Sequence, residues 1–546
     1  MSPTNSFREW LVHLVLVFST VLLADADDQV PLRTASGIAP RRVAIIGAGS
    51  GGSSTAYYLR QYADFFDIPV NLTVFERNPY VGGRSTTVNV FDNASYPVEL
   101  GASIFVEVNY NLMDAVKKFG LNISGAGQDR PNEAEEVIGI WDGERFVYTQ
   151  SESLSLWNIA KLIWRYGLAP IRTRSLMRNT VNKFVKLYKP PFFPFSSLSS
   201  ATVELGLHKA TAATGAEFLK ANGISAPFSQ EIIQASTRVN YGQNLALIHG
   251  LETMVCMATD GAVSVEGGNW QIFAGMLNSS RAHVNLNTAV TSIQRNSNGT
   301  FTISHVQDDH SLEQSLFDDV VIAAPFQESD IKISPPLDHV PDTIPYVTLY
   351  VTLFSSPHRL SSRFFNLEDA EVPETVLTTL PHGLDLGSRE DGVGPAGFWS
   401  ISTLAKVQPQ GEHETSEAPP EHYVYKIFSP GRLTAEFLAN VLGVDAPQSA
   451  GNLTIGDLPR EDISWFYEKT WHSYPYLYPR QTFEQISLAS NLWYTSGIES
   501  FISTMETSSL MGMNVAGLMV EDWHEKLRLG KPVEWNRWVK ADNTEL

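Results

Sequence analysis

The stretch Arg41-Arg42-Val43-Ala44-Ile45-Ile46-Gly47-Ala48-Gly49-Ser50-Gly51-Gly52 decides the fold of this chain. Its first half is a short apolar run bounded by glycine, which is typical of a buried parallel strand. Its second half fits the pattern G-x-G-x-x-G. The spacing of apolar residues predicts a helix from Ser53 to Phe66, and residues 70–76 form the next predicted strand. This order of strand, glycine turn, helix and strand predicts a βαβ unit over residues 42–76.

Each of the three motif glycines has a physical task in a dinucleotide site. Gly47 permits the tight turn, Gly49 lets a pyrophosphate approach the main chain, and Gly52 lets helix and strand pack closely. The helix directs its free N–H groups and the positive end of its dipole at the pyrophosphate. Glu76 lies 24 residues after Gly52, where a carboxylate accepts a hydrogen bond from a ribose hydroxyl. The sequence therefore predicts a dinucleotide-binding domain.

Composition excludes several classes of protein. The chain has 546 residues, 43% of them hydrophobic, and a formal net charge of −20. This length predicts two or more structural units. Nucleic-acid binding needs a net basic face, so the acidic excess excludes it. Cys256 is the single cysteine, which excludes intramolecular disulfides and cysteine zinc sites. The histidines show no helical metal-ligand spacing, so we expect no metal site.

The N-terminus and the sequons indicate the compartment. Residues 1–26 contain a basic start, a short apolar run and a small-residue end, the pattern of a secretory signal peptide. A signal anchor is the alternative, although the run is shorter than a membrane span of ~20 residues. The sequence contains six N-x-S/T sequons, of which the one at Asn71 lies in a strand predicted to be buried. We expect the secretory pathway, ending in a vacuole or lysosome or outside the cell, and N-glycosylation at Asn93, Asn122, Asn278, Asn298 and Asn452.

The residues after Glu76 indicate which dinucleotide is bound. Residues 77–84 end in Gly82-Gly83-Arg84 and resemble the extension found in glutathione-reductase-like and amine-oxidase-like flavoproteins. In those families the second glycine pair and the arginine hold the FAD pyrophosphate from its other side. The resemblance assigns this role to Gly83 and Arg84, and a guanidinium suits a diphosphate. Residues 98–103 resemble the segment beside the flavin in those families. Residues 284–293 resemble the amine-oxidase strand that lies on the adenine, which implies that Val290 is the contact residue. The resemblance implies FAD. We expect it to be held non-covalently, because no cysteine lies near the C-terminus where amine oxidases attach their flavin; attachment through a histidine is the alternative.

The arrangement of predicted elements favours interleaved domains. A second strand-rich block runs from residue 283 to residue 326, with a hairpin turning at Asn298-Gly299, and residues 130–260 are predicted to be mostly helical. The predicted fold class is α/β, a Rossmann-type FAD-binding domain interleaved with an α+β substrate domain. The FAD-binding domain comprises residues 41–130, 261–330 and 481–525, and the substrate domain comprises residues 131–260 and 331–480.

Three further segments, residues 238–243, 261–269 and 471–475, narrow the family. With the C-terminal run of residues 497–508 they resemble the prenylcysteine oxidase (prenylcysteine lyase) family over roughly residues 41–525. A polar loop at residues 407–421 departs from that pattern. The resemblance implies an FAD-dependent thioether oxidase that cleaves farnesyl- or geranylgeranyl-cysteine to cysteine, a prenyl aldehyde and hydrogen peroxide. Its partners are then prenylcysteine and dioxygen.

The resemblance also implies roles for single residues. A helix beginning at Met505-Glu506 directs its N-terminal N–H groups at the flavin and stabilises its anionic reduced form. Glu499 resembles the acid near the ribityl-phosphate region, and a solvated helix-entry carboxylate is the alternative. Candidates for the cysteine head group are Arg238, Asn240 and Tyr241, although an arginine bonding a neighbouring loop explains Arg238 equally well. No catalytic residue is identified.

Residues 153–203 contrast with the acidic chain, because they contain no Asp or Glu but eight cations and eight aromatic residues. We hypothesise that this segment rests on an anionic luminal membrane. The alternative is a helical cap whose aromatic side chains face a substrate tunnel.

Two other functions stay open for the whole chain: an amine oxidase of the same fold, and an inactive homologue that carries isoprenoid lipids.

Overall fold

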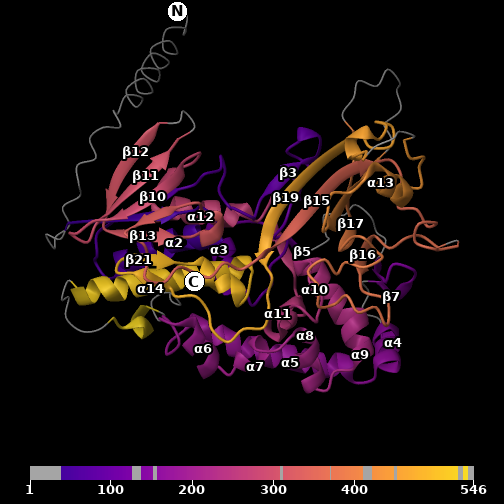
Figure 1. Ribbon diagram of the computed structural model, residues 1–546, viewed down its shortest axis with the longest axis horizontal. Coiled ribbons are helices and arrows are strands. Elements are labelled where there is room, and N and C mark those ends of the chain that lie inside the picture. The colour runs from indigo at the N-terminus through magenta and orange to yellow at the C-terminus, as the bar shows by residue number, and fades with distance from the viewer. Residues whose placement is uncertain are drawn as a thin grey trace, which may run out of the picture. The chain divides into compact units, whose positions relative to one another are not determined.

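The computed structural model describes residues 39–125, 137–151, 156–307, 311–368, 370–409, 421–447, 452–526 and 533–538. The predicted signal peptide and most of the polar loop at residues 407–421 lie outside these ranges. The segment Arg41–Leu546 forms one structural unit, and Figure 1 labels its elements in chain order. Within the described residues, no helix combines the length and the apolar character needed to span a bilayer.

A six-stranded sheet of order β20-β21-β13-β1-β2-β9 carries the dinucleotide half. Its centre is β1 (Arg41–Ile46), which pairs in parallel with β2 (Val70–Phe75) and with β13 (Asp319–Ile322). The remaining strands are β9 (His283–Asn285), β20 (Ser487–Ala489) and β21 (Leu492–Tyr494). Segments far apart in the chain therefore share one sheet. The predicted strands at both ends of the glycine motif are confirmed.

Helix α2 (Ser50–Phe65) begins three residues before its predicted start. Gly49 is the N-cap residue, with extended backbone, so the helix begins within the glycine motif. The Ser53 N–H group already donates to the Gly49 carbonyl over 2.9 Å. The close packing that Gly52 permits therefore belongs to the first helical turn.

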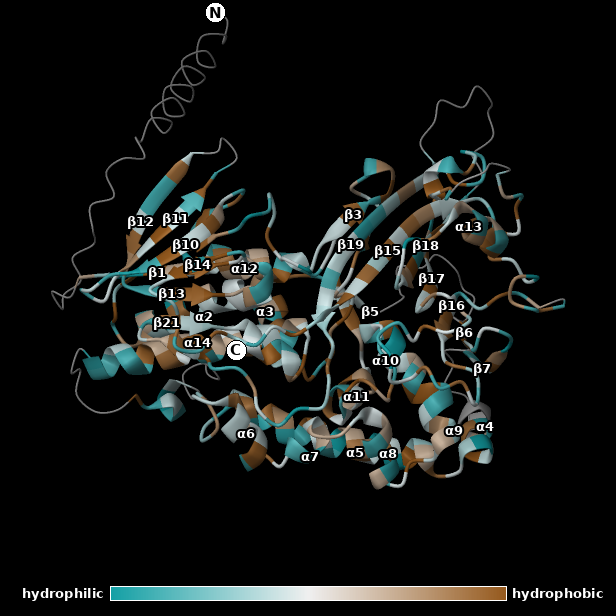
Figure 2. Cartoon of the chain, in the orientation of Figure 1, coloured by the Kyte–Doolittle hydropathy of each residue, from teal (hydrophilic) through white to brown (hydrophobic). Residues whose placement is uncertain are grey.

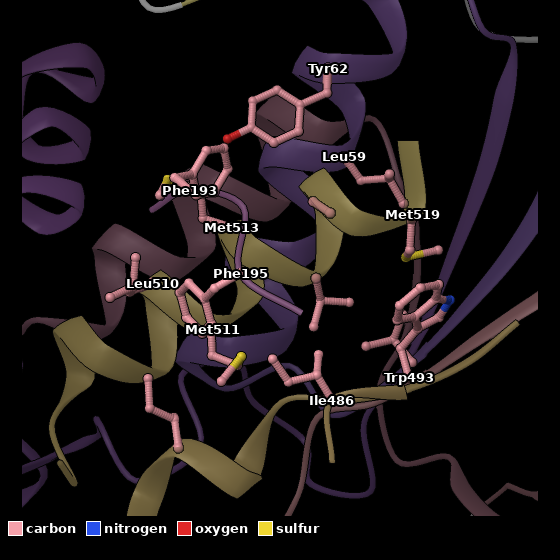
Figure 3. Close-up of a cluster of buried hydrophobic side chains, with 14 of the residues drawn as sticks. Leu59, Tyr62, Phe193, Phe195, Ile486, Trp493, Leu510, Met511, Met513 and Met519 are labelled. Carbon is pink, nitrogen blue, oxygen red and sulfur yellow. The ribbon is translucent and has the colours of Figure 1, made fainter. Parts of the chain in front are cut away.

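The largest core lies where α2 packs against α14 (Met505–Lys526). Figure 3 shows Leu59 and Tyr62 of α2 facing the methionine-rich side of α14, with Phe193 beside them. Phe193 and Phe195 are both buried here. Burying such a side chain stabilises the fold by roughly 1.5–3 kcal/mol. The C-terminal helix is thus held directly behind the helix that follows the glycine turn.

A four-stranded sheet of order β12-β11-β10-β14 adjoins the dinucleotide half. Its strands β10 (Ala289–Arg295) and β11 (Phe301–Val306) form the hairpin predicted around Asn298-Gly299. The other two strands are β12 (Leu312–Phe317) and β14 (Lys332–Ser334).

A seven-stranded sheet of order β19-β15-β18-β17-β16-β6-β7 forms the second half. Its two longest strands, β15 (Tyr346–Ser356) and β19 (Trp465–Pro475), run antiparallel through the middle of Figure 1. Residues 130–260 are mostly helical, as predicted, except near their start, where this sheet takes up Val137–Trp141 and Phe146–Ser151. Those residues are rich in β-branched and aromatic side chains, and tertiary pairing with β16 sets them as strands. The sheet also contains β18 (His422–Ser429), β17 (Ser400–Val407), β16 (Thr375–Thr378), β6 (Val137–Trp141) and β7 (Phe146–Ser151).

The rest of the region predicted as helical does form helices, which lie together below the sheets in Figure 1. They are α4 (Leu156–Tyr166), α5 (Ala169–Phe184), α6 (Leu198–Glu204), α7 (His208–Thr211), α8 (Gly215–Ala221), α9 (Ala226–Phe228), α10 (Gln234–Tyr241) and α11 (Gly250–Cys256). Elsewhere the chain forms α3 (Tyr110–Phe119), α12 (Trp270–Ser280), α13 (Ala435–Leu442), β3 (Thr87–Asn89), β4 (Pro97–Glu99), β5 (Ile123–Gly125) and β8 (Val263–Val265).

Candidate active site

Two of the three motif glycines are required by the fold itself. Gly47 has a φ of 109°, and a Cβ atom there would lie 2.7 Å from the Ala323 carbonyl oxygen. A Cβ at Gly52 would lie 1.9 Å from the Gly47 carbonyl oxygen. Both approaches are far closer than atoms can pack, so any side chain at either position forces the turn or the helix to move.

The third glycine is different, because the protein leaves room for a side chain there. A Cβ at Gly49 would lie 3.7 Å from the Gly83 α-carbon and 4.0 Å from the Gly82 carbonyl oxygen, which are ordinary separations. Its φ of −78° also suits any residue. The open face at Gly49 lies at the N-terminus of α2, the surface that attracts a phosphate group. These residues fit the pyrophosphate of a dinucleotide.

Glu76 braces this turn. Its buried carboxylate accepts the Ala48 N–H over 2.8 Å through Oε2 and the Asn78 backbone N–H over 2.9 Å through Oε1. The Asn78 side-chain amide donates a third hydrogen bond to Oε1. A carboxylate offers about four acceptor positions, so these contacts leave capacity for a ribose hydroxyl. That role of Glu76 stays a prediction.

The second glycine pair lies against the first. The Gly82 N–H donates to the Ala48 carbonyl over 2.9 Å, and Gly49 and Gly82 form a parallel bridge. Gly82 and Gly83 have φ values of 108° and 60°, which L side chains rarely adopt. The fold therefore brings both glycine segments to one place, as the flavoprotein resemblance implies.

Arg84 and Glu499 form an ion pair beside these glycines. The Arg84 guanidinium lies 2.7 Å from Oε2 of the buried Glu499 carboxylate and also donates to the Ser473 carbonyl. The Tyr346 hydroxyl donates to Glu499 over 3.1 Å. Glu499 is therefore not a solvated carboxylate. Contact of either side chain with phosphate or ribityl groups stays a prediction.

A small open cleft lies next to this ion pair. Its lining comes from residues 325–327 after β13, from the segment 342–346 that leads into β15, and from the segment 494–500 before α14, together with Pro475 and Glu484. Glu499 and Tyr346 line it directly. The cleft thus brings segments of both large sheets together beside the ion pair.

The start of α14 meets the start of α2. The Ser50 hydroxyl donates to the Met505 carbonyl over 2.6 Å, and the Thr504 hydroxyl accepts from the Thr507 N–H over 3.0 Å. The two helix N-termini therefore lie close together, and their dipoles favour negative charge nearby. The role implied for this terminus needs backbone groups and no particular side chain.

The Glu506 side chain has its own partners within the protein. Its buried carboxylate accepts the N–H groups of Asn111 and Leu112 at the start of α3, over 2.9 and 3.1 Å, and the Tyr188 hydroxyl over 2.6 Å. Burial raises the pKa of Glu506 to about 7. Met505 packs partly buried against the hydrophobic cluster that contains Phe105 and Leu112. The Glu506 side chain is thus engaged in capping α3.

Val290 lies buried in β10, in a hydrophobic cluster that includes Phe75 at the end of β2. This places it near Glu76, the residue that follows Phe75. Its contact with adenine stays a prediction.

The contacts of Arg238 favour a structural role, in which it bonds a neighbouring loop, over binding of the cysteine head group. Its side chain is fully buried and its guanidinium donates to Thr378 Oγ1, Asn244 Oδ1 and the carbonyls of Gly392 and Val393. It also stacks over the Trp399 ring at 4.7 Å. Burial lowers the pKa of Arg238 to about 9. Arg238 therefore bonds a neighbouring loop, and its donors already have protein acceptors.

The other two substrate candidates have local partners as well. The Asn240 amide donates to the Ser236 carbonyl over 2.8 Å within α10. The Tyr241 hydroxyl donates to the Ser503 carbonyl over 3.1 Å, and its ring packs edge-on against Tyr474 at 5.0 Å. Tyr241 thus ties α10 to the segment that begins α14. Substrate binding by Asn240 and Tyr241 stays a prediction.

Sequence reasoning missed four polar atoms near Arg84. Ser85 Oγ, Glu99 Oε2, Trp471 Nε1 and Ser473 Oγ are buried and have no hydrogen-bond partner among the described residues. Burying such an atom without a partner costs about 1–3 kcal/mol. A polar ligand group removes that cost, so these atoms fit a flavin ring or a substrate head group. The segments 98–103 and 471–475 were the signal, but sequence cannot tell which of their atoms are buried.

Gly101 connects these atoms in space. A Cβ at Gly101 would lie 3.1 Å from the Trp471 ring and 3.9 Å from the Arg84 carbonyl oxygen. Lys426 donates to the Glu99 carbonyl and to Ser103 Oγ, over 3.1 and 3.2 Å. The segment predicted to pass beside the flavin is therefore packed against β18 and β19 of the second sheet.

Comparison with known proteins agrees with this geometry. The family model for prenylcysteine lyase matches residues 149–529, and a model for an NAD(P)-binding Rossmann-like domain matches residues 45–119. The chain is 30% identical to farnesylcysteine lyase from Arabidopsis thaliana over 514 residues, 89% of each protein. It is 28% identical to prenylcysteine oxidase 1 from Rattus norvegicus over 527 residues, 92% of each protein.

Among solved structures, putrescine oxidase bound to putrescine matches with a TM-score of 0.52 and 15% identity, covering 88% of this chain and 99% of that one. At that identity the likeness shows the fold alone, and it confirms the predicted fold class. The Rossmann-like match, the cradle at Gly49 and the unpaired polar atoms identify FAD as the cofactor. Because one family model covers well over half of its length, the chain belongs to the prenylcysteine lyase family.

Proposed function

We propose that this protein is an FAD-dependent oxidase of S-prenyl-L-cysteine that acts in the breakdown of prenylated proteins. The observation that carries the proposal is the extent of the family match. Residues 149–529 include most of the second sheet, the helices α4 to α11 and the C-terminal part of the flavin site. The fold that it shares with amine oxidases does not favour an amine substrate by itself.

The overall reaction balances with water and dioxygen. The farnesyl or geranylgeranyl thioether, one water and one dioxygen yield cysteine, a prenyl aldehyde and hydrogen peroxide. Bound FAD supplies the two-electron oxidation at the carbon beside sulfur and the transfer of those electrons to dioxygen. The chain's own task is to position that carbon and to exclude wrong substrates.

The described residues divide this task. The Gly49 face and the start of α2 hold the pyrophosphate, and the Arg84–Glu499 pair closes the site beside it. The start of α14 stabilises negative charge, since its N–H groups point outward from the helix end. The unpaired atoms of Ser85 and Ser473 orient polar groups of the ligands. No catalytic residue is assigned, and we propose that FAD is held non-covalently.

Peroxide release by the purified full-length protein tests the proposal. We expect a bound-flavin visible spectrum, and peroxide from S-farnesyl-L-cysteine but none from putrescine. Peroxide from putrescine alone would replace the proposal by an amine oxidase. A chain without flavin that still binds farnesylcysteine would be an isoprenoid-binding homologue and would also overturn it.

Compartment and surroundings belong to the same proposal. Entry into the secretory pathway, to a vacuole or lysosome or to the outside of the cell, is supported by the exposed sequon side chains of Asn122, Asn278, Asn298 and Asn452, and by the half-buried one of Asn93. Asn71 is exposed although it lies in β2. A shift in electrophoretic mobility after endoglycosidase treatment tests glycosylation. We include in the proposal a peripheral contact with an anionic membrane through residues 153–203.

A further inference from the structure

The turn between α4 and α5 presents an apolar surface to solvent. We define the α4–α5 elbow as residues 163–171. In it Trp164 is 91% exposed, while Leu168 and Ile171 are each 55% exposed. Trp164 lies in the last turn of α4, Leu168 in the connection and Ile171 in the first turn of α5. Three large apolar side chains are therefore exposed within eight consecutive residues of one bend.

The elbow is anchored from beneath. Tyr166 and Ala169 are buried between the exposed residues, and the Tyr166 hydroxyl donates to Glu231 over 2.6 Å. Arg165 pairs with the same carboxylate over 2.8 Å. The exposed side chains thus project from a fixed turn, and ordering them on a partner costs little backbone entropy.

The segment that contains the elbow carries cations but no carboxylates of its own. Arg172 and Arg178 are exposed on α5, and Arg174 is exposed but pairs with Asp260. Residues 153–203 contain no acidic side chain, whereas the whole chain has a net charge of −20. Such a surface suits a partner that is both apolar and anionic. Figure 2 shows α4 and α5 in the helical layer, carrying hydrophobic and hydrophilic residues next to each other.

The structure separates the elbow from the other aromatic residues of the segment. Phe193 and Phe195 lie in the core against α14 and cannot reach a partner. Trp164 points to solvent, so at this residue the tunnel-facing alternative is wrong. The contact proposed for residues 153–203 is thereby narrowed to the elbow and the α5 cations.

We infer that the α4–α5 elbow inserts its apolar side chains into the interface of an anionic lipid bilayer, with the α5 arginines on the headgroups. The inference rests on the proposed function in one respect. A substrate with a farnesyl or geranylgeranyl chain partitions into lipid, so an oxidase docked on the bilayer meets it there. Burial of Trp164, Leu168 and Ile171 supplies the apolar part of the binding, and charge complementarity supplies the selectivity for anionic lipid.

Vesicle co-sedimentation of the full-length, FAD-loaded protein tests the inference. The vesicles contain phosphatidylcholine alone or with phosphatidylserine. We expect binding to the anionic vesicles only, and a loss of about tenfold or more in partitioning for the triple variant Trp164→Ser, Leu168→Ser and Ile171→Ser. The matched control is Leu312→Ser, which removes a side chain 64% exposed on β12 and leaves binding unchanged.

Charge and activity give two independent readouts. Arg172→Glu with Arg178→Glu should weaken binding to anionic vesicles and leave the flavin spectrum unchanged. The triple variant should oxidise farnesylcysteine in solution at the parent rate but geranylgeranyl-cysteine in vesicles more slowly. If no farnesylcysteine is oxidised by any form, the proposed function fails while vesicle binding still decides the docking.

Three results would overturn the docking inference. The first is binding that the triple variant retains. The second is binding that does not depend on anionic lipid. The third is a Trp164-dependent dimer in sedimentation velocity, which would make a second copy of this chain the occupant of the elbow.

Discussion

The Arg84 guanidinium and the Glu499 carboxylate lie 2.7 Å apart and join two segments that are separated by more than 400 residues. Arg84 follows the second glycine pair, and Glu499 lies just before the helix α14. The pair therefore locks the start of the flavin-binding unit to its end. Tyr346 adds a hydrogen bond from the start of β15 in the second sheet.

Disruption of this pair should weaken both FAD binding and folding. We expect Arg84→Met to lower the free energy of unfolding by roughly 1–3 kcal/mol, because Glu499 is left buried without its cation while Arg84 is partly exposed. The double variant Arg84→Met with Glu499→Gln should recover part of that loss. Urea unfolding and flavin titration measure both effects. Arg389→Met breaks the exposed pair with Asp391 and serves as a control that changes neither.

Gly49 and Gly52 should respond differently to the same substitution. We expect Gly49→Ala to fold with an unchanged melting temperature and to lose FAD, because its Cβ occupies only the space in front of the turn. Gly52→Ala should fail to fold or lose several degrees of stability, because its Cβ would lie 1.9 Å from a carbonyl oxygen. Thermal unfolding and the visible flavin spectrum separate the two. Tight FAD binding by Gly49→Ala would contradict the ligand role of this glycine.

Three buried carboxyl groups should make the protein more stable near pH 5 than near pH 8. Burial raises the pKa of Glu99 to about 7, of Glu252 to about 8 and of Glu506 to about 7. A group whose folded pKa is raised contributes stability that is fully present below its unfolded pKa of about 4.3 and is lost as pH rises through the folded value. The urea midpoint should therefore fall between pH 5 and about 8.

Glu252→Gln is the control for this pH dependence. The Glu252 side chain is buried and accepts the Ser503 N–H over 3.2 Å, which a glutamine carbonyl can also accept. We expect the variant to fold and to show a smaller fall in midpoint between pH 5 and pH 8. A variant with the same pH slope as the parent protein would show that Glu252 does not contribute.

Arg238 should prove to be structural. We expect Arg238→Met to lose roughly 3 kcal/mol or more of unfolding free energy, because Asn244, Thr378 and two carbonyl groups lose their donor in a buried place. The KM for farnesylcysteine of any folded fraction should stay near the parent value. Arg178→Met, an exposed arginine on α5, should leave stability unchanged. A raised KM without loss of stability would instead place Arg238 at the substrate.

Some features of this protein follow from the sequence by itself. The two strands and the glycine turn of the first βαβ unit can be predicted from short stretches of sequence, because they depend on backbone sterics and on the spacing of apolar residues. The same holds for the hairpin at Asn298-Gly299 and for the order of motifs that indicates the family. The turn and the hairpin have their physical cause in neighbouring residues, and the order of motifs is a property of the sequence, so neither needs the fold to be known.

Tertiary structure decided the rest. Val137–Trp141 forms a strand because it pairs with β16, and the local sequence pattern does not predict that pairing. Arg238 and Glu506 look like free charged groups in the sequence, but their partners come from loops and helices far along the chain. Burial, ion pairs and unpaired polar atoms depend on which distant segments meet. Trp164 and Phe193 are both aromatic residues of the same basic segment, and the sequence does not distinguish them. In the structure Trp164 is exposed at the elbow, whereas Phe193 lies in the core.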